Sequence, residues 1–365
     1  MDAMSRGYLP ADAIPLEGVL RVLVIKLRHH GDVLLASPVL SVLKNHAPHV
    51  EIDALVYADT AEMLSLHPAL NHLFLIDRRW KNQCILAQVR HEYRLLKGLR
   101  ERHYDLIIHL TEHWRGAWLT RLCKPRWSVA PAVRGRGRRW VRAFTHLARS
   151  ANGRHVVESN LDALRRIGIQ PASEERSLTL IPGHEAEQTV DSLINELGLV
   201  AGNFLHVHPA SRWQFKCWPV ESMAELIGRL QAEGLSVVLT AAPDPDELAM
   251  VEAIQGRLAS PAQSLAGRLS LKELAALTAR ARLFVGVDSA PMHIAAAMGT
   301  PVVALFGPSG YDLWGPWTPK RRIVTQEDYT CRPCGIDGCG GGKTSDCLAM
   351  LPVEQVWAAC CELLA

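Results

Sequence analysis

The sequence predicts an α/β protein with two doubly wound domains, each a parallel sheet covered by helices. Short apolar runs alternate with stretches of helical periodicity in both halves of the chain, which is the pattern of βα units. The chain has 365 residues, a length that suits two cores better than one. The two series of alternating elements meet near residues 181–203, where we expect the domain boundary.

The apolar runs give the strands, and the periodic stretches between them give the helices. In the first half we expect strands at 21–27, 50–57, 72–76 and 104–110, and an amphipathic helix at 86–102. In the second half we expect strands at 204–208, 236–241, 283–287 and 302–306. The helices expected there are 220–233, 245–258, 271–279 and a final one at 353–364. The predicted parts are therefore an irregular extension, two domains and a C-terminal helix, at 1–20, 21–190, 200–352 and 353–365.

Composition and charge narrow the class of protein. Apolar residues make up 48% and charged residues 21%, as in soluble globular proteins. No apolar run is long enough for a transmembrane helix, and no basic segment precedes an apolar core as in a secretory signal, which favours the cytoplasm. Residues 1–180 hold 27 Lys/Arg against 17 Asp/Glu, whereas the remainder holds 13 against 20. This asymmetry indicates an anionic partner for the first half.

A dense group of charges follows the first strand, within "VLVIKLRHHGDVLLASPVL". Ligands of open parallel sheets bind beyond the carboxyl ends of the strands, so this position is a candidate site. Asp32 has two interpretations: the N-cap of a helix that begins near Val33, or a general base that faces a cleft. The N-cap interpretation leaves unexplained the neighbouring cations, which suit an anionic ligand. They are Lys26, Arg28, His29 and His30, followed by Gly31.

The segment "HVHPASRWQFKCWP" places a polar loop after the strand at 204–208. Ser211, Arg212 and Lys216 lie in this loop, and two cations with a hydroxyl at a strand end can hold a phosphate. A solvated loop is the alternative. Pro219 then opens a helix, as proline does at a first helical position.

A third segment, "LFVGVDSAPMHIAAAMGTPVVALFGPS", reads as strand, turn, helix and strand. Asp288 and Ser289 are expected to cap the helix, whose first amides, over 290–292, suit a diphosphate. The carboxylate of Asp288 would accept hydrogen bonds from sugar hydroxyls. His293 lies one turn into the helix, where a satisfied polar residue is the alternative interpretation.

Other patterns are weaker. "GCGGGKT" at 338–344 resembles a phosphate-binding loop, but its spacing is one residue short and no strand precedes it. No GxGxxG motif follows a strand, which argues against a nicotinamide site. Residues 121–154 hold ten Lys/Arg and no acid, with few aromatic residues, which favours a solvated run or an arm for an anionic surface over a nucleic-acid site. A cysteine cluster could hold a structural metal or consist of free, redox-sensitive thiols: Cys331, Cys334, Cys339 and Cys347.

From about Leu20 onward, the sequence resembles the bacterial lipopolysaccharide heptosyltransferases, glycosyltransferase family 9. The segments that carry the resemblance are "KLRHHGDVLLASPVL", "HPASRWQFKCWP", "AGRLSLKELAAL" and "GVDSAPMHIAAAMGTPVVALFGPS". "HHGDVLLASPVLSVLK", "ALVYADTAEML" and "YDLIIHLTEHWRG" are most similar to the branch that adds the third, side-chain heptose. The resemblance implies a GT-B fold, two Rossmann-like domains across a cleft, with the acceptor on the first and the nucleotide sugar on the second.

The resemblance also implies the chemistry: inverting, metal-independent transfer of heptose from ADP-L-glycero-β-D-manno-heptose, with no cofactor required. Asp32 would be the base, Lys216 with the amides near Ala290 and Pro291 would stabilise the diphosphate, and Asp288 would hold sugar hydroxyls. The other donor-binding residues implied are Ser211, Glu247, Leu269, Ser289 and His293. The chain departs from many relatives at Ala290-Pro291, where they have Gly-Leu, and at Cys217, where they have histidine.

The implied acceptor is the phosphorylated, heptosylated lipid A–core oligosaccharide at the inner face of the inner membrane, bound by a monomer. The residues expected to hold it are Arg28, His29, His30, Gly31, Arg134, Arg136, Arg138 and Arg139. The alternatives are another lipopolysaccharide-core heptosyltransferase or nucleotide-sugar transferase of this fold, a nucleotide-sugar epimerase, and a metal- or redox-binding protein built on the cysteine cluster. A nucleic-acid binder would rest on the basic run at 121–154 alone.

Overall fold

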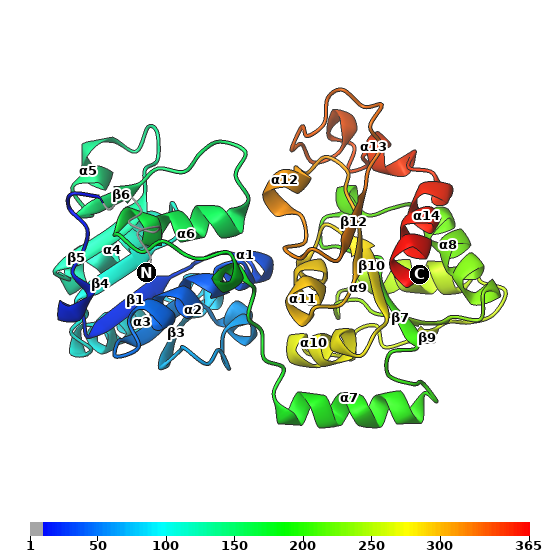
Figure 1. Ribbon diagram of the computed structural model, residues 1–365, viewed down its shortest axis with the longest axis horizontal. Coiled ribbons are helices and arrows are strands. Elements are labelled where there is room, and N and C mark those ends of the chain that lie inside the picture. The colour runs from blue at the N-terminus through cyan, green and yellow to red at the C-terminus, as the bar shows by residue number, and fades with distance from the viewer. Residues whose placement is uncertain (1–9) are drawn as a thin grey trace, which may run out of the picture. The chain divides into compact units, whose positions relative to one another are not determined.

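The computed structural model describes residues 10–365, and the chain divides into two compact units, Met1–Thr179 and Leu180–Ala365 (Figure 1). Each unit contains a six-stranded sheet in which every strand pair is parallel. The predicted fold class is therefore confirmed. The finer domain limits at 190, 200 and 352 stay predictions.

The sheet of the first unit has the strand order β3-β2-β1-β4-β5-β6. Its strands are β1 (Arg21–Ile25), β2 (Glu51–Tyr57), β3 (His72–Ile76), β4 (Leu106–His109), β5 (Trp127–Pro131) and β6 (His146–Ala148). Its helices are α1 (His30–Leu34), α2 (Ser37–His46), α3 (Ile85–Glu101), α4 (Trp114–Cys123), α5 (Gly137–Val141) and α6 (Val156–Arg166). Short 3-10 turns are η1 (Leu16–Gly18), η2 (Ala58–Met63), η3 (Arg78–Asn82) and η4 (Glu174–Arg176).

The second unit repeats this topology, with the strand order β12-β11-β10-β7-β8-β9. Its strands are β7 (Phe204–His208), β8 (Ser236–Leu239), β9 (Gln263–Ser264), β10 (Leu283–Val287), β11 (Val302–Leu305) and β12 (Arg321–Val324). Its longer helices are α7 (His184–Glu196), α8 (Val220–Ala232), α9 (Pro245–Gln255), α10 (Leu271–Ala279), α11 (Ala290–Met298) and α14 (Val353–Leu364). The shorter elements are α12 (Tyr311–Trp314), α13 (Asp346–Ala349), η5 (Gln214–Lys216) and η6 (Cys339–Gly341).

The central strands form because their apolar runs are buried on both faces. In the first unit, Leu23 and Ile25 of β1 are fully buried against Leu95 and Leu99 of α3. Each such side chain stabilises the fold by about 1.5–3 kcal/mol. In the second unit, α8, α9 and α14 cover one face of the sheet, while α7, α10 and α11 cover the other.

This topology determines where each unit can bind a ligand. The strand order reverses between β1 and β4 in the first sheet and between β7 and β10 in the second. Loops at the carboxyl ends of two such strands diverge and leave a crevice, the usual binding position in open α/β sheets. The segments that follow β1 and those that follow β7 and β10 are the ones that the sequence analysis singled out.

The structure bears on the predicted irregular extension at the start of the chain. The prediction of an irregular extension falls partly on residues 1–9, which lie outside the described residues. Ile14 is buried and its amide donates to the carbonyl of Ile167 (3.0 Å), so the next segment packs on the first unit.

The interpretation of Asp32 as an N-cap is wrong: α1 begins at His30 with His29 at its N-cap. In the part of the chain that the structure describes, no helix is long and apolar enough to cross a membrane.

Candidate active site

Asp32 is the third residue of α1, directly beyond the carboxyl end of β1. Its Oδ1 lies 3.6 Å from Nε of Arg28, close enough for an ion pair and too long for a hydrogen bond. Its side chain is 12% exposed, and among residues 10–365 it accepts no hydrogen bond. A carboxylate in this state can take a proton from a hydroxyl group that reaches it.

Lys26 lies buried behind Asp32. Its Nζ donates to Oδ1 of Asn160 (2.9 Å) and to the carbonyl of Leu110 (3.3 Å). Burial lowers the pKa of Lys26 to about 8, which the negative charge of Asp32 partly opposes. The sequence showed this lysine at a strand end, but its contact with α6 was not apparent from the sequence.

The neighbouring loops fix the residues around Asp32. His30 Nε2 donates to the carbonyl of Asp59 after β2 (2.8 Å). Arg78, after β3, donates to the carbonyl of Arg28 (2.9 Å), and its guanidinium stacks on Tyr57, 4.1 Å from the ring centroid. The cationic loop after β1 is therefore held in place by the ends of the two adjacent strands, β2 and β3.

Arg136, another cation of the predicted acceptor set, lies in the loop between β5 and α5. His113 precedes α4, beyond β4, and its pKa is lowered chiefly by partial burial and then by the charges of Arg28 and Arg136. Arg136 itself stacks near two indole rings, 5.9 Å from Trp114 and 5.7 Å from Trp140. The charges of Arg28 and Arg136 thus both act on His113, a residue that the sequence analysis did not select.

The other acceptor candidates are more dispersed. Arg134, Arg138 and Arg139 are exposed, and they form no ion pair within residues 10–365. Gly31 lies in the first turn of α1, beside Asp32. The three arginines therefore add to the positive charge of the surface, whereas Arg28 and Arg136 both lower the pKa of His113.

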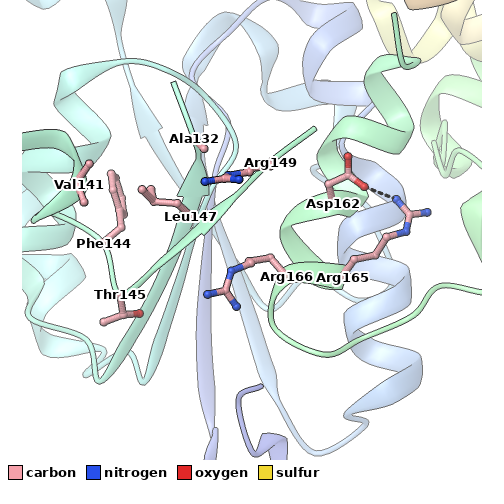
Figure 2. Close-up of a pocket in the computed structure, with 9 residues that line it drawn as sticks. All are labelled: Ala132, Val141, Phe144, Thr145, Leu147, Arg149, Asp162, Arg165 and Arg166. Atoms are coloured by element: carbon pink, nitrogen blue, oxygen red, sulfur yellow. Dashed lines mark hydrogen bonds and ion pairs between the residues drawn. The ribbon is translucent and has the colours of Figure 1, made fainter. Parts of the chain in front are cut away.

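A cavity of about 730 Å³ in the first unit is lined by other residues. Figure 2 shows Phe144 and Leu147 on one wall and two arginines of α6 on the other, with Arg165 paired to Asp162 (2.7 Å). Its lining residues are Ala132, Val141, Phe144, Thr145, Leu147, Arg149, Asp162, Arg165 and Arg166. None of the predicted site residues is among them.

In the second unit, Lys216 and Asp288 form the centre of the candidate donor site. Lys216 ends η5, after β7, and Asp288 follows β10; the two strands are neighbours, with Gly286 opposite His208. Lys216 Nζ lies 2.5 Å from Asp288 Oδ2. The structure therefore brings together two residues that the sequence analysis placed in separate motifs.

The first turn of α11 adds donors next to Asp288. Ser289 is the N-cap residue, but its Oγ makes no cap hydrogen bond and is buried without a partner among residues 10–365. Pro291 has no amide N–H, so within residues 10–365 the helix leaves the amides of Ala290 and Met292 without an intrahelical partner. Because a helix N-terminus carries partial positive charge, it suits a diphosphate. His293 is buried in the same turn.

Glu247 of α9 is anchored to the segment that follows β8. Its Oε2 accepts from the amide of Ala242 (2.9 Å), and burial raises the pKa of Glu247. His208 Nε2 lies 3.9 Å away, but burial lowers the pKa of His208 to about 4, so this histidine is neutral near pH 7. The other ring nitrogen of His208, Nδ1, lies 2.8 Å from Oγ1 of Thr240.

Ser211 and Glu247 share a cavity of about 520 Å³ at this edge of the sheet. Cys217, Lys343 and Thr344 also line it, and the sequence analysis had not linked the glycine-rich segment around Lys343 to this loop. Leu269 does not line this cavity and packs against the α7 and α10 cluster.

All nine cysteines are free thiols. Cys347 is buried, and its pKa is raised by burial and, more weakly, by Cys339, Cys334 and Cys331. Within residues 10–365, no group of three or more His, Cys, Asp or Glu is placed to hold a metal ion.

Two parallel, doubly wound sheets in one chain are the architecture of the GT-B fold. The family model glycosyltransferase family 9 (heptosyltransferase) matches residues 92–343, and the chain belongs to this family. The predicted family is therefore confirmed, and the protein is a glycosyltransferase.

Three comparisons extend this result. The chain is 36% identical over 340 residues to lipopolysaccharide heptosyltransferase 3 of Escherichia coli, covering 93% of this chain and 97% of that one. Its fold matches a family 9 glycosyl transferase from Veillonella parvula, with a TM-score of 0.81, 22% identity and coverage of 97% and 99%. It also matches E. coli heptosyltransferase WaaC with ADP-2-deoxy-2-fluoro heptose, with a TM-score of 0.72, 20% identity and coverage of 94% and 99%.

Proposed function

We propose that this protein transfers L-glycero-D-manno-heptose from ADP-heptose to the heptosylated inner core of lipopolysaccharide, as a heptosyltransferase of the third type. The observation that carries the proposal is the 36% identity to lipopolysaccharide heptosyltransferase 3 across nearly the full length of both chains.

The second unit binds the donor in this proposal. Lys216 and the amides of Ala290 and Met292 neutralise the diphosphate, and the hydroxyl of Ser289 donates to it. Asp288 orients Lys216 and accepts from sugar hydroxyls. These groups stabilise the charge that develops on departing ADP, which is the main electrostatic requirement of the reaction. The positive charge comes from the chain itself, so the proposal needs no metal or cofactor.

The first unit supplies the base. Asp32 removes the proton of the acceptor hydroxyl as its oxygen attacks the anomeric carbon of heptose. The bond from that carbon to the diphosphate oxygen breaks, ADP leaves, and the proton stays on Asp32. Attack opposite the leaving group inverts the anomeric centre. The cations around His113, together with the arginines of α5 and the loop before it, bind the phosphorylated core of the acceptor.

In this proposal the enzyme acts as a monomer, and its lipid-linked acceptor lies at the cytoplasmic face of the inner membrane. The excess of Lys/Arg over Asp/Glu in residues 1–180 supports an anionic acceptor on the first unit. No nucleic-acid partner is part of this proposal.

Product analysis tests the function directly. Purified protein is incubated with ADP-heptose, with and without a core acceptor that lacks the third heptose, and ADP and the acceptor mass are measured. We expect ADP release that depends on acceptor, with one heptose added per acceptor, and the same rate in a metal chelator. ADP release with free sugar and no acceptor dependence would support the epimerase alternative. Transfer of another sugar would keep the fold and change the donor.

A further inference from the structure

Helix α3 of the first unit presents an apolar stripe to solvent. Ile85, Leu86, Val89 and Tyr93 are each between 60% and 82% exposed. At about 100° per residue, these four positions lie within roughly 100° of the helix circumference. Another side of the same helix is already covered, since Leu95 and Leu99 are buried in the core. The stripe is therefore additional to what the fold needs.

Cations flank this stripe. Arg90, Arg94 and Lys97 are exposed and follow the stripe around the helix on one side. Lys97 is 3.8 Å from Glu101, whereas Arg90 and Arg94 form no ion pair within residues 10–365. An exposed apolar stripe next to unpaired arginines is the pattern of a helix that lies in a membrane interface.

The neighbouring helix α4 extends the same character. Its exposed side carries Trp118 and Leu122, one helical turn apart. Arg115 of α4 is bonded to Glu92 of α3, so the two helices lie side by side. Tryptophan and tyrosine are the side chains that favour the headgroup region of a bilayer.

We propose that the lipid-docking surface, defined as Ile85, Leu86, Val89, Tyr93, Arg90 and Arg94, binds an anionic bilayer. The apolar side chains enter the interface and the arginines bind lipid phosphates. A second copy of the chain is a poorer occupant, because a two-fold contact would bring the same arginines of both copies together. The biological setting, a lipid-linked acceptor, rests on the proposed function; the binding itself does not.

Vesicle flotation tests the surface. Full-length protein is mixed with vesicles of phosphatidylglycerol and phosphatidylethanolamine, or of phosphatidylcholine alone. We expect flotation with the anionic vesicles and weaker flotation at high salt. The double variant Leu86→Ser/Val89→Ser should lose binding by about tenfold or more. Arg90→Gln/Arg94→Gln should lose the preference for anionic vesicles. Val200→Ser, which alters an exposed apolar residue of the second unit, should bind as the wild type does.

Two outcomes would overturn the proposal: no flotation of the wild type with anionic vesicles, or flotation of both α3 variants equal to that of the wild type. Sedimentation that shows a dimer in the wild type and a monomer in Leu86→Ser/Val89→Ser would assign the surface to a second copy instead.

Transfer assays separate the test of this surface from the test of the proposed function. The α3 variants should keep wild-type rates on a deacylated, water-soluble core and lose rate on acceptor in vesicles. Absence of transfer to both acceptors in the wild type would refute the function and leave the flotation result standing.

Discussion

Lys216 Nζ lies 2.5 Å from Asp288 Oδ2, although 72 positions separate the two residues in the sequence. The contact exists because β7 and β10 are adjacent parallel strands and both residues follow their carboxyl ends. The pair holds the ammonium group next to the first turn of α11, where unpaired amides already favour an anion. In the proposed mechanism, the cation is therefore oriented before the diphosphate arrives.

Lys216→Ala should therefore weaken catalysis through loss of charge on the leaving group. We expect kcat/KM to fall by about 10²-fold or more, together with weaker ADP binding measured by calorimetry. Lys320→Ala, which removes an exposed lysine of the same unit, should leave both values unchanged. Wild-type ADP affinity in Lys216→Ala would show that this residue does not contact the diphosphate.

Ser289→Ala should lower the affinity for ADP without lowering the free energy of unfolding. The Ser289 hydroxyl makes no cap bond and is buried without a partner in the described residues, so its removal should cost no free energy of unfolding. Because a bound diphosphate would satisfy this hydroxyl, ADP affinity should fall by about fivefold to tenfold. Chemical denaturation and calorimetry on the same preparation provide the two readouts. A loss of stability with unchanged affinity would make Ser289 a structural cap.

Gly116→Ala should destabilise the first unit, although alanine favours a helix. A Cβ at Gly116 would lie 2.1 Å from Cε1 of the buried His109, so the ring or α4 must move. Overpacking of this kind costs about 1–3 kcal/mol. Gly228→Ala in α8 is the matched control, since no atom lies within 4 Å of its Cβ, and it should stabilise by about 0.5–1 kcal/mol. Thermal and denaturant unfolding would measure both changes. Equal stability of the two variants would show that His109 is not packed as described.

Lys26 should give the protein a specific dependence of stability on pH. Its pKa is about 8 in the folded state against 10.5 for an ordinary lysine. Between these values the unfolded chain binds more protons than the folded one, so this group makes stability rise as pH increases from about 8 to 10. The full effect is at most about 3 kcal/mol. The increase should be absent from Lys26→Met when both proteins are unfolded in denaturant at each pH. The same slope in both proteins would place the titration elsewhere.

The eight strands expected from apolar runs all occur. Seven of them are largely buried, and the apolar run was a sufficient signal even for β3, an edge strand in which only Ile76 is buried. The four strands that the sequence did not predict, β5, β6, β9 and β12, extend the sheets outward from this centre. β9 has two residues, Gln263 and Ser264, and β12 begins with Arg321 and Arg322, so neither shows an apolar run. β9 and β12 form because each pairs with a neighbouring strand, and this pairing leaves no signal in the local sequence.

Prediction of the site had a similar limit. Lys216 and Asp288 could be assigned because strand ends collect at one edge of a parallel sheet. The contact of Lys26 with Asn160 spans 134 positions and depends on how α6 packs, which no local pattern encodes. The start of α1 was placed too late because His29, His30 and Gly31 look like a polar loop, whereas the helix begins within them.

The central claim is that Asp32 is the base for sugar transfer, and its most direct test is the turnover rate of Asp32→Asn. This variant keeps the shape of the side chain and removes its ability to take a proton. With saturating ADP-heptose and core acceptor, we expect kcat to fall by about 10²–10⁴-fold while ADP affinity stays at the wild-type value. Asp77→Asn, which changes a carboxylate paired with Arg79 on the same unit, should keep wild-type turnover. Near wild-type kcat in Asp32→Asn would contradict the account and assign the base to another group.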